Sequence, residues 1–158
     1  MDYEESKKYV LEMFCLEKFR KQQEDSVKTF LFDQKNIFFS ALTGFGKSLI
    51  FHTIPFIHDM MSGNLLGNSI VIVISPLNSL IDDQLSYLRS VGVTSVALRN
   101  NNSMSDIVSE EGEILPLLIY CSPETLNINK WRKLFSSTEF RKLCLGVVVD
   151  EAHCIATL

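Results

Sequence analysis

One short loop contains the residues best suited to bind a polyanion, and its sequence is Ala41-Leu42-Thr43-Gly44-Phe45-Gly46-Lys47-Ser48. Gly44 and Gly46 permit the backbone to curl around an anion and to aim its N–H groups at it. Lys47 adds a positive charge for the outer phosphates of a nucleotide, and the Ser48 hydroxyl suits Mg²⁺. These residue types in this order predict a phosphate-binding loop.

The segments on either side of this loop have the patterns that a phosphate-binding loop requires. Ile37–Ser40 is largely apolar and predicts a short strand, whereas residues 47–61 predict a helix in spite of Pro55. A helix N-terminus behind a glycine-containing loop forms an anion site, because its first N–H groups are unpaired. The alternative is an ordinary turn with a chance Gly-Lys-Ser.

A second polar segment, Asp150-Glu151, follows the apolar run Leu145–Val149, which also predicts a strand. In enzymes with phosphate-binding loops, an Asp at such a position holds Mg²⁺. An adjacent Glu can polarise the attacking water as a general base. Two acids after a strand are more often the start of a helix. Together with the first loop, however, they predict a site for ATP and Mg²⁺ in which Lys47, Asp150 and Glu151 are catalytic.

Apolar patterns elsewhere predict helices and strands that alternate along the chain. The uninterrupted β-branched run Ile70–Ile74 indicates a strand buried on both faces, as in a parallel sheet. The other predicted elements are strands at 94–98 and 117–121, helices at about 3–19, 23–32, 77–89 and 131–140, and a polar connection over 100–112. This alternation predicts a doubly wound α/β fold with a largely parallel sheet and helices on both faces. Both candidate loops would then follow the carboxyl ends of strands.

The composition indicates one globular domain without a general affinity for nucleic acid. The 158 residues are 46% apolar and 22% charged, which is sufficient for a hydrophobic core. Because the net charge is −4, any contact with nucleic acid would need a local patch. Basic residues do cluster, at Lys18/Arg20/Lys21 and at Lys130/Arg132/Lys133 with Arg141/Lys142. A solvated helix face explains such clusters as well as a phosphate-binding face does.

The cysteines and the apolar runs indicate an intracellular, soluble protein. Cys15, Cys121, Cys144 and Cys154 are far apart and form no C-x-x-C pair, so we expect neither structural zinc nor a disulfide framework. The acidic first residues match neither a secretory signal nor a mitochondrial presequence. No apolar run is long enough to cross a membrane.

Several motifs together resemble those of RecQ-type DNA helicases. In chain order they are F-R-K-Q-Q at 19–23, T-G-F-G-K-S at 43–48, S-P-L at 75–77 with D-Q at 83–84, S-P-E at 122–124 and D-E-A-H-C-I at 150–155. The Cys-Ile after D-E-A-H favours RecQ proteins over other D-E-A-H motors. The resemblance extends over about residues 14–155. It implies the first RecA-like lobe of an ATP- and Mg²⁺-dependent 3′-to-5′ DNA helicase, a hydrolase and isomerase of DNA repair and recombination, nuclear in a eukaryote.

The resemblance also implies roles for individual residues. Arg20 and Gln23 would lie at the adenine, and Thr43 and Phe45 would belong to the nucleotide-binding loop. His153 would couple the nucleotide state to DNA. A further group would contact the backbone phosphates of single-stranded or forked DNA without reading sequence, namely Ser75, Pro76, Leu77, Ser122 and Pro123. The alternative for this group is a set of strand-to-helix caps with an early proline.

The chain departs from the family pattern at a few positions. Phe45 replaces a third glycine, which stiffens the loop, and Ala156 and Leu158 replace the Ser and Trp that begin a DNA-sensing loop. The second motor lobe, with its arginine finger, is missing from these residues. We expect residues 1–22 to form an N-terminal helix and adenine-reading segment, and residues 23–158 to form the ATP-binding lobe.

From these departures we expect a polypeptide that binds nucleotide with magnesium, hydrolyses it very weakly and does not unwind DNA. One alternative is a non-catalytic module that binds nucleotide, DNA or a partner. Another is an unrelated enzyme with a phosphate-binding loop, such as a small kinase, although the D-E-A-H sequence argues against it.

Overall fold

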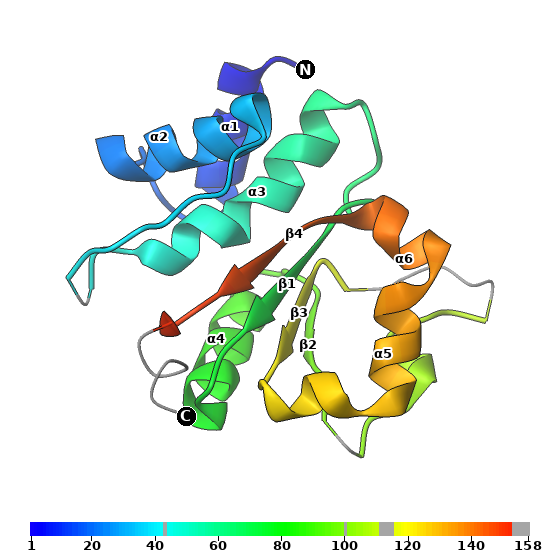
Figure 1. The fold of residues 1–158 in the computed structure, drawn as a ribbon. Coiled ribbons are helices and arrows are strands. Elements are labelled where there is room, and N and C mark those ends of the chain that lie inside the picture. Colours follow the sequence, from blue (N-terminus) through cyan, green and yellow to red (C-terminus); the bar gives the residue numbers. More distant parts are fainter. Residues whose placement is uncertain (43, 100, 111–115, 153–158) are drawn as a thin grey trace. The chain divides into compact units, whose positions relative to one another are not determined.

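A computed structural model of the chain describes residues 1–42, 44–99, 101–110 and 116–152. The chain divides into two compact units, Met1–Leu66 and Gly67–Leu158 (Figure 1). None of the helices within the described ranges combines the length and the apolar composition needed to cross a membrane.

The first unit is helical in its described part. It contains α1 (Tyr3–Met13), α2 (Lys21–Lys28) with a π-helical turn at Thr29–Asp33, and α3 (Lys47–Met61). The predicted bounds of α3 are confirmed, and α2 with its π-helical turn covers the helix predicted at 23–32. The predicted extension of the first helix to residue 19 is wrong. It ends at Met13 because Cys15 adopts a left-handed conformation, with φ 57°, that stops the helical hydrogen bonds.

The apolar faces of these three helices form a common core, in which Val10, Phe14, Val27 and Ile57 are almost fully buried. Phe14 of the first connection contacts the edge of the Phe56 ring of α3 at a centroid distance of 6.2 Å. This core holds the start of α3, and therefore the loop before it, against α1 and α2.

The strand predicted at Ile37–Ser40 is wrong, because these residues lie outside any helix or strand. Phe38 is 89% exposed, so the segment is not sandwiched between helices as a central strand would be. A strand exists only by pairing with a neighbour, and the described residues of this unit offer helices but no strand. The apolar composition of the segment was therefore insufficient to predict its conformation.

The second unit is built on a four-stranded, entirely parallel sheet in the order β2-β3-β1-β4 (Figure 1). The strands are β1 (Ile70–Ile74), β2 (Ser95–Ala97), β3 (Leu118–Cys121) and β4 (Cys144–Val149). All four were predicted, and β1 has the predicted bounds. The α/β fold class is thereby confirmed, and the sheet with its helices is consistent with a RecA-like domain.

Helices and short turns connect these parallel strands. They are α4 (Asn78–Ser90), the 3₁₀ turns Met104–Asp106 and Glu124–Asn127, α5 (Asn129–Ser136) and α6 (Thr138–Leu143). The single helix predicted at 131–140 is wrong, because Ser137 is extended, with ψ 146°, and separates two helices. The Ser137 hydroxyl accepts a hydrogen bond from the Phe140 N–H at 3.3 Å and so caps the second helix.

Alternate strand residues face opposite layers of this unit. Ile72 and Ile119 pack with Trp131 of α5, which is fully buried. On the opposite face of β3, the Tyr120 hydroxyl donates a hydrogen bond to Gln84 Oε1 of α4 at 3.2 Å. Because helices cover both faces, β1 and β3 are apolar throughout rather than alternating.

Candidate functional site

The predicted phosphate-binding loop has the backbone geometry that anion binding needs. Gly44 and Gly46 both lie in the left-handed region, with φ 83° and φ 87°. Gly46 is the N-cap of α3, so Lys47 is the first helical residue and the unpaired N–H groups of the helix start directly after the loop. The Lys47 ammonium donates to the Ala41 carbonyl at 3.3 Å, which directs it back across the loop. Lys47 and Ser48 are both partly exposed.

The Gln23 side chain of α2 anchors this loop by hydrogen bonds to its backbone. Its side chain is only 3% exposed. Its amide nitrogen donates to the carbonyls of Gly46 at 2.9 Å and Phe45 at 3.3 Å, and its amide oxygen accepts from the Arg20 N–H at 2.8 Å. A Cβ atom at Gly46 would lie 2.7 Å from the Gln23 amide nitrogen. The absence of a side chain at Gly46 therefore permits both the positive φ and the close approach of Gln23.

Phe45, which replaces a glycine of the family pattern, is packed between two neighbours. The Arg20 guanidinium lies 4.6 Å from the centre of its ring, and the Phe39 ring lies 5.6 Å away. A guanidinium over an aromatic face is attracted by the ring quadrupole. The structure thus brings Arg20, Gln23, Phe45, Gly46 and Lys47 together, and their roles at a nucleotide stay a prediction. The bonds from Gln23 to the loop carbonyls were not anticipated, since a contact 23 residues apart leaves no local signal.

Several predicted functional residues lie outside the described residues. These are Thr43 of the loop, His153 after the acidic pair, Cys154, and the two family departures Ala156 and Leu158.

The second unit brings three predicted polar positions together at the carboxyl edge of its sheet. Ile74 is in register with Cys121 on one side and with Val149 on the other, so Ser75, Ser122 and Asp150 begin neighbouring loops. Backbone bonds fix these loops, since the Ser75 N–H donates to the Cys121 carbonyl and the Asp150 N–H to the Ile74 carbonyl, both at 2.9 Å. Ligands of open α/β sheets bind at this edge.

The acidic pair itself has an unusual backbone. Glu151 adopts φ 52°, a conformation that costs a residue with a Cβ atom roughly 1 kcal/mol or more. Its N–H donates to the Asp150 carboxylate at 3.1 Å. Burial, with a smaller contribution from the Asp150 charge, raises the pKa of Tyr120, so this phenol stays neutral behind the acid. Backbone conformations of this kind are concentrated at functional sites.

The residues expected to face DNA differ in their exposure. Leu77 is 46% exposed, whereas Ser75 is buried and its hydroxyl has no hydrogen-bond partner within the described ranges. The Ser122 hydroxyl lies 3.0 Å from that of Thr125, as in a cap of the following 3₁₀ turn. Pro76 and Pro123 are partly exposed. At this edge, Leu77, Pro76, Ser122 and Pro123 are therefore the accessible members of the group.

The described residues include oxygen donors of the kind that Mg²⁺ prefers. No group of three or more His, Cys, Asp or Glu side chains that could hold a metal occurs in the described part of the chain. Mg²⁺ bound to nucleotides needs only one or two protein oxygens, because phosphates and waters complete its octahedron. Ser48 in the first unit and Asp150 in the second each carry an oxygen donor of this kind.

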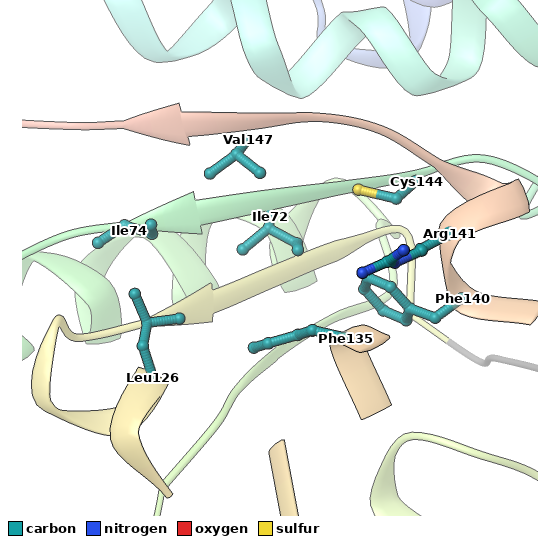
Figure 2. A pocket seen from close by; sticks show the side chains of 8 residues that line it. All are labelled: Ile72, Ile74, Leu126, Phe135, Phe140, Arg141, Cys144 and Val147. Atoms are coloured by element: carbon teal, nitrogen blue, oxygen red, sulfur yellow. The ribbon is translucent and has the colours of Figure 1, made fainter. Parts of the chain in front are cut away.

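The second unit also contains a cavity of about 390 Å³ on the face of the sheet that α5 and α6 cover (Figure 2). It is lined by Ile72, Ile74, Leu126, Phe135, Phe140, Arg141, Cys144 and Val147. Arg141 is the one charged group in this lining, and no carboxylate or hydroxyl accompanies it. The cavity thus lacks the polar groups that a nucleoside triphosphate and its metal ion require.

Comparison with known proteins identifies the family. A sequence model of the DEAD/DEAH box helicase family matches residues 20–158. The chain belongs to this family. Among its relatives, this helicase domain is 33% identical over 93% of its length to ATP-dependent DNA helicase Q1 of Rattus norvegicus, and 31% identical over 91% to ATP-dependent DNA helicase RecQ of Haemophilus influenzae. It is 33% identical over 92% of its length to ATP-dependent helicase wrn-1 of Caenorhabditis elegans.

These relatives are much longer than the helicase domain described here. The chain covers 23% of the Rattus norvegicus protein, 22% of the Haemophilus influenzae protein and 13% of the Caenorhabditis elegans protein. The similarity to RecQ-family proteins confirms the resemblance that the five motifs indicated.

Proposed function

We propose that the chain is the ATP-binding first lobe of a RecQ-like 3′-to-5′ DNA helicase, which couples ATP hydrolysis to duplex unwinding. The observation that carries this proposal is the loop at the start of α3. There, two glycines with positive φ precede Lys47, which opens a 15-residue helix. Backbone N–H groups, a helix N-terminus and a lysine converge there on one anion-binding position.

Within this proposal, the residues of the two loops divide the chemistry of hydrolysis. Lys47 exchanges its bond to the Ala41 carbonyl for the outer phosphates, and Ser48 and Asp150 provide oxygens for Mg²⁺. Mg²⁺ held by these oxygens would supply positive charge against the negative charge that develops on the phosphates. Glu151 orients the attacking water and accepts its proton.

We further propose that Arg20 and Gln23 position the adenine beside this loop. Both polar ends of the Gln23 amide already bind backbone groups. Reading the base would therefore require Gln23 to exchange at least one of these bonds, which would link adenine binding to the conformation of the loop. Arg20, which is exposed and lies over Phe45, needs no such exchange.

The DNA side of the proposal rests on the resemblance and on the exposure of residues at the sheet edge. Leu77, Pro76, Ser122 and Pro123 would contact the sugar–phosphate backbone, and His153 would couple these contacts to the nucleotide. Such contacts position a strand without reading its sequence. A role in DNA repair and recombination, hydrolase and isomerase activity, and an intracellular location, nuclear in a eukaryote, belong to the same proposal.

For a polypeptide of these 158 residues alone, we propose nucleotide binding with very weak hydrolysis and no unwinding. The chain covers less than a quarter of the relatives compared above. An arginine finger supplied by a second lobe or partner raises the rate of P-loop enzymes by on the order of a thousandfold or more.

Binding of a fluorescent ATP analogue with Mg²⁺ tests the proposal. Lys47→Ala removes charge-assisted hydrogen bonds worth about 1.5–3 kcal/mol, so we expect an affinity loss of roughly 10- to 150-fold. Lys35→Ala is the matched control, because Lys35 is an exposed lysine of the same unit. Equal affinity of the two variants would refute the proposed site, and no binding by the unmodified chain would refute nucleotide binding altogether.

A further inference from the structure

The helix pair α5–α6 carries most of the unbalanced positive charge of the chain. Residues 129–143 contain five basic side chains and one acidic side chain, although the whole chain has a net charge of −4. The remainder of the chain is therefore strongly acidic. This contrast concentrates positive charge on two helices of the second unit.

Four of the five cations are presented to solvent without a partner. Arg132 and Lys133 on α5 and Arg141 and Lys142 on α6 are exposed, and within the described residues none of the four forms an ion pair or a side-chain hydrogen bond. By contrast, several other cations of the chain form ion pairs, as Lys7 and Lys28 do with Glu24 and as Arg99 does with Asp82.

The fifth cation, Lys130, has a structural role. Its ammonium donates to the Asn102 carbonyl and lies 4.6 Å from the centre of the Trp131 ring. The buried side chains Trp131, Leu134 and Phe140 fix the two helices on the sheet. The helices that carry the four exposed cations are therefore fixed, so little backbone freedom is lost when these side chains bind a ligand. Arg141, although exposed, also borders the cavity under the two helices.

The two helices run from one edge of the sheet to the other. The chain passes from the Ser122–Pro123 loop at the carboxyl edge, through the 3₁₀ turn at Glu124–Asn127, into α5, and then through α6 to the amino end of β4. Because α5 has eight residues, it spans about 12 Å. The two helices that carry the cations thus lead from the loop proposed to contact DNA toward the opposite edge of the sheet (Figure 1).

The exposed side chains of these two helices match a nucleic-acid backbone better than a lipid or a protein partner. Apart from Glu139, they are cations, amides and hydroxyls, namely Asn129, Arg132, Lys133, Ser136, Thr138, Arg141 and Lys142. All of these types bind phosphate oxygens. The core of a protein interface, or a helix that inserts into a membrane, would also present large apolar side chains among them.

We propose that the solvent face of α5–α6 is a second nucleic-acid contact surface, which binds the phosphates of a DNA strand through Arg132, Lys133, Arg141 and Lys142 independently of sequence. The proposal deepens the proposed function, and rests on it in so far as DNA is the polyanion that a helicase lobe meets. This surface on α5 and α6 would contact DNA in addition to the loops at the carboxyl edge of the sheet.

The number of these phosphate contacts can be measured from the way the DNA-binding constant falls with salt concentration. We would titrate the 158-residue chain with a fluorescein-labelled single-stranded 20-mer, without nucleotide, between 50 and 200 mM salt. Each phosphate neutralised on a single strand contributes roughly 0.7 to the slope of log K against log salt. Four contacts therefore give a slope of about −3 and an affinity loss of roughly 50-fold over this salt range.

Paired substitutions assign the slope to residues. R132Q with K133Q, and R141Q with K142Q, should each reduce its magnitude by about 1.4, and the quadruple variant should remove most of it. K8Q with K35Q removes two exposed lysines from the first unit and should leave the slope unchanged. Circular dichroism checks that every variant remains folded.

Three outcomes would overturn the proposal. They are an unmodified chain without salt-sensitive DNA binding, a folded quadruple variant with unchanged affinity and slope, and preferential binding of polyglutamate, which would assign the surface to an acidic protein. Fluorescent ATP binding by the quadruple variant separates this test from the proposed function. If the unmodified chain fails to bind ATP but binds DNA through these four residues, the proposed function is refuted and the DNA-binding surface is not.

Discussion

The two candidate loops of the chain are held in place by different kinds of contact. The loop before α3 is anchored by side chains, with Gln23 bonded to two of its carbonyls and Arg20 over Phe45. The loop that carries Asp150 continues a sheet strand, and its first N–H donates to the Ile74 carbonyl of the neighbouring strand. The position of the first loop therefore depends on a few side chains that can be substituted. The position of the second depends on the backbone hydrogen bonds of the sheet.

This difference predicts how each region responds to substitution. A single side-chain change can disturb the phosphate-binding loop while the helices of its unit stay folded, because their core does not include the loop. At the acidic loop, the backbone bonds survive any change of side chain, so positional damage there requires destabilisation of the sheet. Displacement of the loop should therefore separate from unfolding in the first unit and accompany it in the second.

The largest effect on stability is expected for Trp131→Ala. Trp131 is fully buried against the sheet, and truncation of such a residue costs about 3–5 kcal/mol. Urea unfolding followed by circular dichroism should show this loss for the second unit, with Trp131→Phe losing much less. A change below about 1 kcal/mol for the alanine variant would show that α5 does not hold the sheet, and would remove the distinction between the two regions.

A smaller effect, confined to the first region, is expected for Gly46→Ala. A left-handed alanine costs about 1–2 kcal/mol, and the new Cβ atom would also displace the Gln23 amide, which lies 2.7 Å away. Gly44→Ala is the matched control, since Gly44 has a similar φ but no atom within 4 Å of an added Cβ.

Both alanine variants should bind the ATP analogue more weakly, and Gly46→Ala by roughly a further tenfold, with urea unfolding of the second unit unchanged. The tenfold difference corresponds to about 1.4 kcal/mol for the displaced Gln23 bonds. Equal affinities would show that Gln23 does not anchor the loop.

The smallest expected effect is a loss of stability of the second unit at alkaline pH. Burial raises the pKa of the Cys121 thiol to about 12. The unfolded chain loses this proton near pH 8.5, whereas the folded chain keeps it. The free energy of unfolding should therefore fall as pH rises, by about 1.5 kcal/mol between pH 8.5 and pH 10 for this group.

Urea unfolding at the two pH values measures this loss, and Cys121→Val is the control, because valine has no proton to lose. Burial also raises the pKa of Cys144, so part of the pH dependence should persist in the control. A control with the same pH dependence as the unmodified chain would contradict the assignment to Cys121.

Local patterns predicted most of the elements but not the tertiary contacts that complete them. The run Ile70–Ile74 has its predicted bounds because β-branched residues buried on both faces leave little choice of structure. Residues 37–40 have a similar apolar character, yet they form no strand, since pairing depends on a distant partner. The break at Ser137 carried a local signal, because a serine followed three residues later by a core phenylalanine can begin a new helix.

For the candidate site, too, the sequence predicted the local features but not the contacts between distant residues. Glycine spacing and Lys47 indicated the loop, because positive φ and charge are properties of single residues. The alignment of Ser75, Ser122 and Asp150 followed from the parallel sheet, because equivalent strand ends meet at one edge. The anchoring by Gln23 could not be predicted, since it depends on how α2 packs against the start of α3.

The most direct test of nucleotide binding at this loop is an amide NMR titration of the ¹⁵N-labelled chain with ATP and Mg²⁺. It needs no substitution, and an 18.0 kDa chain is suited to it. We predict that the largest shift changes occur at the amides of Gly44, Gly46, Lys47 and Ser48. Changes centred instead on the cavity near Ile72 and Val147, or no changes at saturating nucleotide, would contradict the assignment of the loop before α3 as the ATP site.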